Sequence, residues 1–323
     1  MSVLVFTENW DGKFKKLSFE LVSYASKLSE MLNTSAIALS IGTVADEELQ
    51  KLGKYGATKI IHATGEELNF LDNQAWVNTI SDVAENENAT VLILSNNIMG
   101  KALAPRLSVR MKAGLGAGVS GLPRSTEPFV VHKKVYSGNA FADVLIRSEK
   151  KILTLSQNSF ELIEKPGNPA IVNLSVSLEA GTVKTKVRDV QKQTGKILLT
   201  DAEVVISGGR GMKSPDNWGP LLELAELLGA ATACSRPVSD EGWRPHEEHT
   251  GQTGKIIAPN LYFAIGISGA TQHLAGVSSS KFIVGINSDK DAPIFEAAQY
   301  GIVGDAAKIL PKLIEAVKEI KGK

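Results

Sequence analysis

Residues 261–273, LYFAIGISGATQH, constrain the fold more than any other stretch of the chain. A short apolar run, typical of a buried strand, leads through Gly266 and Gly269 into helix-compatible residues. The stretch therefore predicts a strand, a tight glycine turn and a helix from about residue 270. Glycines let a backbone approach a ligand closely, and free N–H groups at Ser268 to Ala270 would suit a phosphate. Because glycine turns follow strands throughout α/β proteins, a purely structural turn is the alternative.

Strand-like and helix-like segments alternate along most of the chain, which predicts parallel sheets built from βαβ units. In the first part we expect strands at 3–6, 35–41, 59–63 and 90–95, with helices near 17–32, 43–53, 72–87 and 99–112. In the second part we expect strands at 203–209, 231–235, 255–258, 261–266 and 281–287, with helices near 216–229, from 270 and near 304–320.

The middle of the chain has a different character. Residues 128–190 hold short β-rich runs separated by Gly, Pro and Asn, which predict added antiparallel strands. The polar stretch 191–196 has little to bury, so we expect an N-terminal parallel-sheet α/β domain at 1–195 and a smaller, doubly wound α/β domain at 196–323. Residues 112–121 contain a formal Gly-x-Gly-x-x-Gly, but they follow a helix and precede a proline-containing loop, which favours a flexible connection over a dinucleotide site.

Composition excludes several classes of protein. Lys+Arg and Asp+Glu are both 35, so no basic surplus is present to bind nucleic acid. The single cysteine, Cys234, excludes an internal disulfide and fits a reducing compartment. The N-terminus resembles neither a signal nor a transit peptide, and no apolar run reaches the ~18 residues of a spanning helix. We therefore expect a soluble, cytoplasmic protein without membrane insertion.

Polar turns follow the strands expected in the second domain. Ser207-Gly-Gly-Arg-Gly211 sets consecutive glycine N–H groups beside Arg210, which predicts an anion nest, with a tight turn and a solvated arginine as the alternative. Ser235 and Arg236 end another strand, in a turn fixed by Pro237.

Three stretches match catalytic or metal motifs only in part. At Thr250–Lys255, His249 and Ile256 stand where a P-loop needs a glycine and a hydroxyl. Gly266–Ala270 resembles a nucleophile elbow, but no histidine follows His273, as a hydrolase triad would need. His246-Glu-Glu-His249 lacks a third metal ligand, so we expect a solvated loop there and no metal site.

Two further polar residues complete the set, Asn287 at the end of a strand and Asp305 at the start of the last helix, where it is also a good N-cap. Together the turns supply hydroxyls, amides, N–H groups, two arginines and one histidine, but no convincing catalytic base. Such a set holds a polyanionic ligand more readily than it breaks a bond. We therefore expect a nucleotide-cofactor site with no catalytic residue.

The second domain also resembles a known family, the α subunit of electron transfer flavoprotein (FixB family). The likeness covers nearly all of 203–323 without gaps and includes the signature P-x-L-Y-x-A-x-G-I-S-G-A-x-Q-H-L-A-G, which begins at Pro259. The first domain resembles the family in pattern only. The resemblance implies an FAD in the second domain and a first domain that packs against a β subunit.

The resemblance also implies roles along the FAD. Arg210 and Ser235 belong to the flavin pocket, Arg236 lies against the isoalloxazine ring, and the 250–253 turn places Thr253 near flavin N5. Ser268 to Ala270 meet the pyrophosphate, Gln272 the ribityl region, His273 the C2 carbonyl, and Asn287 and Asp305 the adenosine end. The implied cofactor-binding set is Arg210, Ser235, Arg236, Thr250, Gly251, Gln252, Thr253, Ser268, Gly269, Ala270, Thr271, Gln272, His273, Asn287, Asp305 and Ala306.

A positive group near the N1/C2 edge of a flavin favours the charge that one-electron reduction adds, and Arg236 and His273 are expected to supply it. The sequence departs from the commoner family pattern at Pro237, Ser239, Arg244, His246 and His249, which bears on the potential and not on the cofactor. The polar stretch near 191–200 is expected to act as a hinge.

The function implied is that of an electron carrier working as a heterodimer with a β subunit that holds AMP or a second FAD. It would accept electrons from primary dehydrogenases, such as the acyl-CoA dehydrogenases of fatty acid β-oxidation, and pass them to a membrane-linked ETF-quinone oxidoreductase. One alternative is a stand-alone FAD-dependent oxidoreductase, which would turn over a small substrate. Another is a nucleotide-binding sensor, which would bind ATP or AMP without a flavin spectrum.

Overall fold

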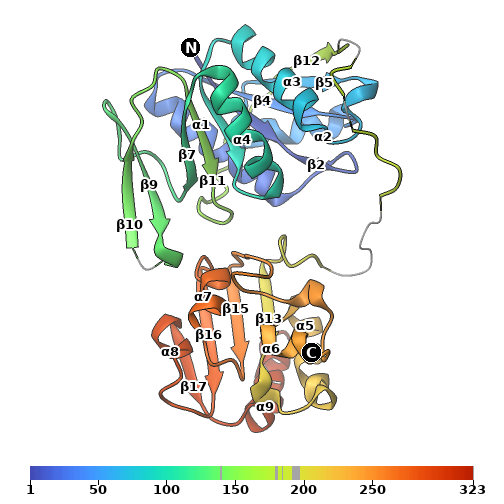
Figure 1. Ribbon diagram of the computed structural model, residues 1–323, viewed down its shortest axis with the longest axis vertical. Helices are drawn as coiled ribbons and strands as arrows, with labels where there is room; N and C mark the ends of the chain where they lie inside the picture. The colour runs from blue at the N-terminus through green and yellow to red at the C-terminus, as the bar shows by residue number, and fades with distance from the viewer. Residues whose placement is uncertain (139, 179–180, 184, 191–196, 323) are drawn as a thin grey trace. The chain divides into compact units, whose positions relative to one another are not determined.

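The structure, a computed structural model, describes residues 1–138, 140–178, 181–183, 185–190 and 197–322. The chain divides into two compact units, the first holding Met1–Val135 and Ala140–Val190 and the second holding, of the described residues, 136–138 and 197–322 (Figure 1). Both are α/β, which confirms the predicted fold class. The predicted boundary between residues 195 and 196, and most of the proposed hinge, lie outside the described residues and stay predictions.

The first unit is built on a mixed sheet whose parallel strands lie in the order β7-β11-β6-β1-β4-β5-β12. Their bounds are β1 (Ser2–Thr7), β4 (Ser35–Ile41), β5 (Lys59–Thr64), β6 (Ala89–Ser95), β7 (Gly114–Val119), β11 (Lys151–Leu155) and β12 (Ala170–Ser175). Helices α1 (Lys16–Met31) and α2 (Asp46–Gln50) pack on one face, and α3 (Asn73–Asn86) and α4 (Ile98–Met111) on the other. The central strands are continuous apolar runs because both of their faces are covered.

The antiparallel part of this sheet is smaller than predicted. Strands β8 (Ser125–Thr126), β9 (Phe129–Val135) and β10 (Ala140–Leu145) pair antiparallel at one edge, as the green hairpin in Figure 1 shows, and β2 (Asn9–Trp10) and β3 (Lys13–Phe14) form a separate hairpin. The prediction was wrong for β11 and β12, which are parallel strands, and for the described part of 181–190, which holds no strand. Local composition signals a strand but not the partner beside which it lies.

The glycine-rich run 112–121 is also not the flexible connection that its sequence suggested. It forms β7, which pairs with β11. A Cβ at Gly116 would lie 3.0 Å from Leu153 and 3.2 Å from Ile146, so side chains of neighbouring segments occupy the space above this glycine. The glycines therefore reflect close packing within the sheet.

The second unit holds, in its described residues, a parallel five-stranded sheet in the order β14-β13-β15-β16-β17 (Figure 1). Its strands are β13 (Val204–Gly208), β14 (Ala231–Cys234), β15 (Leu261–Ile265), β16 (Phe282–Asn287) and β17 (Tyr300–Val303). Its helices are α5 (Gly219–Leu228), α6 (Arg236–Asp240), α7 (Thr271–Val277), α8 (Ile294–Ala297) and α9 (Ala306–Ile320). Helices α5 and α9 pack on one face and α7 and α8 on the other. Residues 255–258, predicted as a strand, form only a bridge between Lys255 and Thr250.

The strand order of the second unit reverses between β13 and β15, because the chain runs outward from β13 to β14 and then returns to the other side of β13. Three glycines bring the ends of β13 and β15 together. A Cβ at Gly209 would lie 2.3 Å from Gly266 O, and one at Gly266, whose φ is +62°, would lie 2.8 Å from Gly211 Cα. Ligands of open α/β sheets bind outside the carboxyl ends of the strands at such a reversal.

We expect Gly266→Ala to destabilise the second unit by about 2 kcal/mol, because a side chain at positive φ is strained and its methyl group meets Gly211. Gly219→Ala is the matched control, since a Cβ there has no neighbour within 4 Å and begins a helix. Urea unfolding followed by tryptophan fluorescence, to which buried Trp218 contributes from the second unit, measures both variants. Equal midpoints for the two would show that the glycine contact is dispensable.

Candidate functional site

The carboxyl edge of the second sheet gathers the residues that the sequence singled out. They are Arg210 after β13, Ser235 and Arg236 after β14, 268–273 after β15, Asn287 at the end of β16, and Asp305 and Ala306 after β17. The 250–253 turn joins the same edge, because Thr250 N donates to Cys234 O at 3.0 Å, at the end of β14. Residues distant in sequence thus meet at the reversal of strand order.

The turn after β15 carries unpaired backbone donors. The N–H groups of Ser268, Gly269 and Ala270 donate to no acceptor among the described residues. Gly269 has φ +84°, and a Cβ there would lie 2.4 Å from Ile294 N, so this glycine is required by its contact with α8. The predicted glycine turn is therefore needed by the fold, and it leaves a row of N–H groups free for an anion.

The anion nest predicted at Ser207–Gly211 does not form as expected. Gly209 N donates to Ile265 O and Gly211 N to Gly266 O, both at 2.9 Å, so the chain itself uses these two donors. The prediction was wrong here because the glycines serve the contact between β13 and β15. Arg210 is exposed beside this turn.

The 250–253 turn is held at both ends. Thr250 is fully buried and its hydroxyl donates to Cys234 O at 3.3 Å. Gln252 N donates to Gln272 O at 2.7 Å, which ties the turn to the first residues of α7. Thr250 and Gly251 therefore shape the turn, whereas Gln252 and Thr253 are exposed and available to a ligand.

Arg236 is the first residue of α6 and lies beside this turn. Its Nη1 is 3.4 Å from Thr253 Oγ1, and its Nε is 3.3 Å from Asp240 Oδ2. The side chain is 63% exposed, so this ion pair is long and solvated. Ser235, just before it, is buried, and its N–H donates to Gly208 O. Arg236 thus presents a weakly held positive charge at the edge.

His273 is buried and neutral, contrary to the expectation that it supplies positive charge. The Tyr262 hydroxyl lies 2.8 Å from its Nε2, and its Nδ1 meets no hydrogen-bond partner among the described residues. Burial lowers the pKa of His273 to about 4, because the desolvated ring disfavours the imidazolium form. At neutral pH His273 therefore offers hydrogen bonds rather than charge.

The residues assigned to the adenosine end already have partners within the chain. Asn287 Nδ2 donates to Ile267 O at 2.9 Å, and its Oδ1 accepts from Asp289 N at 3.0 Å. Asp305 caps α9 by accepting from Ala307 N at 3.0 Å, and it pairs with Lys213 Nζ at 2.7 Å. The pKa of Asp305 is lowered by Lys213 and by this cap. Both side chains therefore shape the edge.

The donors at this edge fit a dinucleotide cofactor such as FAD. Three free N–H groups suit a pyrophosphate. His273 Nδ1 makes no hydrogen bond of normal geometry among the described residues, although the Thr250 backbone is near enough to raise the pKa of this histidine. The exposed side chains along the edge are nearly all polar: Arg210, Arg236, Gln252, Thr253, Ser268, Thr271 and Gln272.

Comparison with known proteins agrees with this geometry. Residues 3–179 match the family described as electron transfer flavoprotein domain, and residues 198–278 match the electron transfer flavoprotein FAD-binding domain. The chain belongs to the electron transfer flavoprotein α-subunit family. It is 35% identical over 319 residues to the electron transfer flavoprotein subunit alpha of Bacillus subtilis (strain 168), with 98% of each chain covered.

Two further relatives of this flavoprotein subunit span nearly its whole length. Protein FixB of Clostridium saccharobutylicum is 32% identical over 323 residues, covering 98% of this chain and 96% of its own. The acryloyl-CoA reductase electron transfer subunit beta of Anaerotignum propionicum is 32% identical over 352 residues, covering 99% of this chain and 96% of its own.

Sequence reasoning missed several buried residues at this edge of the sheet. His249 and Glu248 were assigned to a solvated loop, but both are buried, and Glu248 accepts two hydrogen bonds from Arg244, at 2.7 and 2.8 Å. Tyr262, the partner of His273, looked like one more apolar strand residue. For the ion pair of Arg236 and Asp240, by contrast, the sequence did carry a signal, because a spacing of four residues suits an ion pair on a helix.

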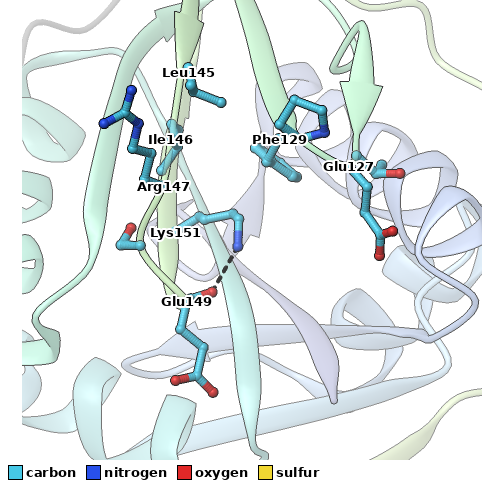
Figure 2. Close-up of a pocket in the computed structure, with 10 residues that line it drawn as sticks. Glu127, Phe129, Leu145, Ile146, Arg147, Glu149 and Lys151 are labelled. Carbon is cyan, nitrogen blue, oxygen red and sulfur yellow. Dashed lines mark hydrogen bonds between the residues drawn. The ribbon is translucent and has the colours of Figure 1, made fainter.

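A separate pocket of the electron transfer flavoprotein subunit lies in its first unit, where β9 begins, β10 ends and β11 begins (Figure 2). Lys151 Nζ donates there to the backbone oxygen of Glu149 at 2.8 Å and lies 5.2 Å from the centre of the Phe129 ring. Lys151 is at the amino end of a parallel strand, opposite to the end where such sheets bind ligands. No predicted cofactor residue lines this pocket.

The part of the chain that the structure describes holds neither a membrane-spanning helix nor a metal cluster. No helix there is long and apolar enough to cross a membrane. No group of three or more His, Cys, Asp or Glu side chains there is arranged to hold a metal ion.

The neutral state of His273 predicts a pH dependence for the second unit. Its pKa is about 4 in the folded chain and about 6.5 in an unfolded one, so the unfolded state binds more protons between these values. This histidine therefore lowers the free energy of unfolding as pH falls from about 6.5 to about 4, by up to roughly 3 kcal/mol. Urea unfolding of the cofactor-free chain at pH 7, 5.5 and 4.5, followed by tryptophan fluorescence, measures the slope.

The control separates this histidine from the acidic residues that titrate in the same window. His273→Gln should flatten the slope relative to the parent chain, whereas His246→Gln, at an exposed position, should not. Parallel slopes for the parent and the His273 variant would refute a buried neutral His273.

Proposed function

We propose that the chain is the FAD-carrying subunit of a heterodimeric electron carrier. The observation that carries this proposal is the row of free N–H groups at Ser268 to Ala270, beside the Arg236–Thr253 pair, within the segment that matches an FAD-binding domain. The Ser239 hydroxyl lies 3.4 Å from His246 Nδ1 in an exposed contact, which is longer than the reach of a nucleophile and its base. The edge is built to hold a cofactor and not to convert a second substrate.

In this proposal the free N–H groups bind the FAD pyrophosphate, as helix starts bind phosphates elsewhere. The exposed side chains of Thr271 and Gln272 continue the contact toward the ribityl chain, and the isoalloxazine ring lies against Arg236 near Thr253. Asn287, Asp305 and Ala306 border the adenosine end. FAD, when bound, supplies the one-electron chemistry of the carrier.

Charge at the ring then comes from Arg236, with Arg210 further along the edge. His273 takes a different part from the one its sequence suggested, because it is neutral and fixed by Tyr262. It donates a hydrogen bond to the C2 carbonyl without adding charge. Arg236 is only loosely held by Asp240, so it is free to lie against a planar ring.

The partners follow from relatives and remain part of the proposal. The name of the Anaerotignum relative joins an electron transfer subunit to an acyl-CoA enzyme, which supports acyl-CoA and related dehydrogenases, including those of fatty acid β-oxidation, as donors. A β subunit packs against the first domain and holds AMP or a second FAD. A membrane-linked ETF-quinone oxidoreductase accepts the electrons.

The test is to purify the chain alone and co-expressed with its β subunit and to extract the cofactors. We expect stoichiometric FAD in the heterodimer and weak FAD retention or aggregation of the chain alone, because a partner that binds only the folded chain stabilises it. A colourless heterodimer that binds ATP or AMP would indicate a nucleotide sensor. A stable yellow monomer that turns over a small substrate would indicate a stand-alone oxidoreductase.

The ion pair of Arg236 and Asp240 predicts two opposite shifts of the flavin's first one-electron potential. Arg236→Ala removes a positive charge and should lower this potential by about 40–100 mV. The shift is expected to be moderate because the side chain is 63% exposed and water screens its charge. Arg236→Lys should lose less. Asp240→Asn removes the opposing charge and should raise the potential. Spectroelectrochemical titration measures these potentials. Shifts of the same sign for Arg236→Ala and Asp240→Asn would show that the ion pair does not tune the flavin.

A further inference from the structure

His249 occupies an unusual place in the second unit, inside the loop of residues 250–255. His249 is 2% exposed, although the neighbouring His246 and Glu247 are exposed. The loop closes around it through backbone bonds, since Lys255 N donates to His249 O at 2.9 Å and Gly254 N to Gly251 O at 3.1 Å. A histidine so enclosed has a structural reason to be there.

Two glycines border this ring. A Cβ at Gly254 would lie 2.8 Å from His249 Nδ1, and one at Gly251 would lie 3.6 Å from Nε2. Gly254 therefore has no room for a side chain, which would meet the His249 backbone oxygen at 2.5 Å as well as the imidazole, whereas Gly251 leaves ordinary van der Waals contact with the ring. The ring fills the space between the two glycines and supports the loop from within.

The ring also lies among charged and titratable neighbours without pairing with them. His249 Nδ1 has no hydrogen-bond partner among the described residues, so a proton added there would meet no acceptor. The groups facing it are His246, whose ring is 5.5 Å away, Arg236, Asp240 and His273. Burial first, and then His246 and Arg236, lower the pKa of His249. His249 therefore acts through its shape as a neutral ring.

The loop that His249 supports carries groups that the proposed cofactor needs. Gln252 N reaches Gln272 O at 2.7 Å, and Thr253 Oγ1 lies 3.4 Å from Arg236 Nη1. We propose that His249 is the positioning residue of the 250–255 loop, and that its imidazole, held between Gly251 and Gly254, sets the place of Thr253 and Arg236 at the flavin.

The first test does not depend on the cofactor. In the full chain without FAD, His249→Ala should speed amide hydrogen exchange at Gly251, Gly254 and Lys255 by about tenfold or more, because their bonds close the loop around the missing ring. His249→Gln, which refills much of the space, should recover most of the protection. His246→Ala removes an exposed imidazole and should change the same amides by less than about twofold. Unchanged exchange of the loop in His249→Ala would overturn the proposal.

Exchange at β13 and β15 separates loop opening from general unfolding. If those strands also lose protection in His249→Ala, the test uses His249→Gln instead. In that variant, the increase in amide exchange rate over the parent chain must be larger for the loop than for the strands. An equal change in loop and strands of the glutamine variant would count against a positioning role.

The second test uses the FAD-loaded heterodimer and rests on the proposed function. His249→Ala should shift the one-electron equilibrium of the flavin by about threefold in the direction of Arg236→Ala, with His249→Gln closer to the parent. A role in stability alone would leave the potential unmoved and would contradict the proposal. If no FAD is retained by any form, the proposed function fails, while the exchange experiment still decides on His249.

Discussion

The backbone contact between the ends of β13 and β15 is the constraint on which the site depends. Gly209 and Gly211 donate to Ile265 and Gly266, and each of the three glycines lies where a Cβ would strike the facing backbone. The contact closes the reversal of strand order and uses donors that would otherwise suit an anion. As a result, the free N–H groups are found a few residues later, at Ser268 to Ala270. The close contact between the ends of β13 and β15 thus determines which backbone N–H groups of the edge are available to a ligand.

Burial divides the basic residues of the edge into two kinds. His273 and His249 are enclosed, so desolvation keeps them neutral, and each contributes shape and hydrogen-bonding capacity. Arg236 and Arg210 are exposed and stay charged. An electron carrier of this kind therefore places its fixed charge in guanidinium groups that water reaches, while neutral imidazoles line the interior behind them.

Several polar residues that pointed to a ligand also serve the fold. Asn287 fastens the turn after β15, Asp305 caps α9 and pairs with Lys213, and Thr250 is bonded to the end of β14. These bonds hold the loops at the edge in fixed positions before any cofactor arrives. Preorganisation of this sort lowers the ordering cost of binding. The same side chains can therefore matter to cofactor retention through the loops that they hold.

The sequence by itself determined the α/β class, the elements of the second sheet except β17, and the set of polar turns, because glycine turns and apolar runs are local signals. It did not determine that Gly114–Val119 is a strand or that β11 and β12 are parallel, since pairing depends on distant neighbours. Likewise, the burial of His249, the neutral state of His273 and the donors used by Gly209 and Gly211 were decided only by tertiary structure. Charge state and free hydrogen-bonding capacity depend on what surrounds a group, and that is set when the chain folds.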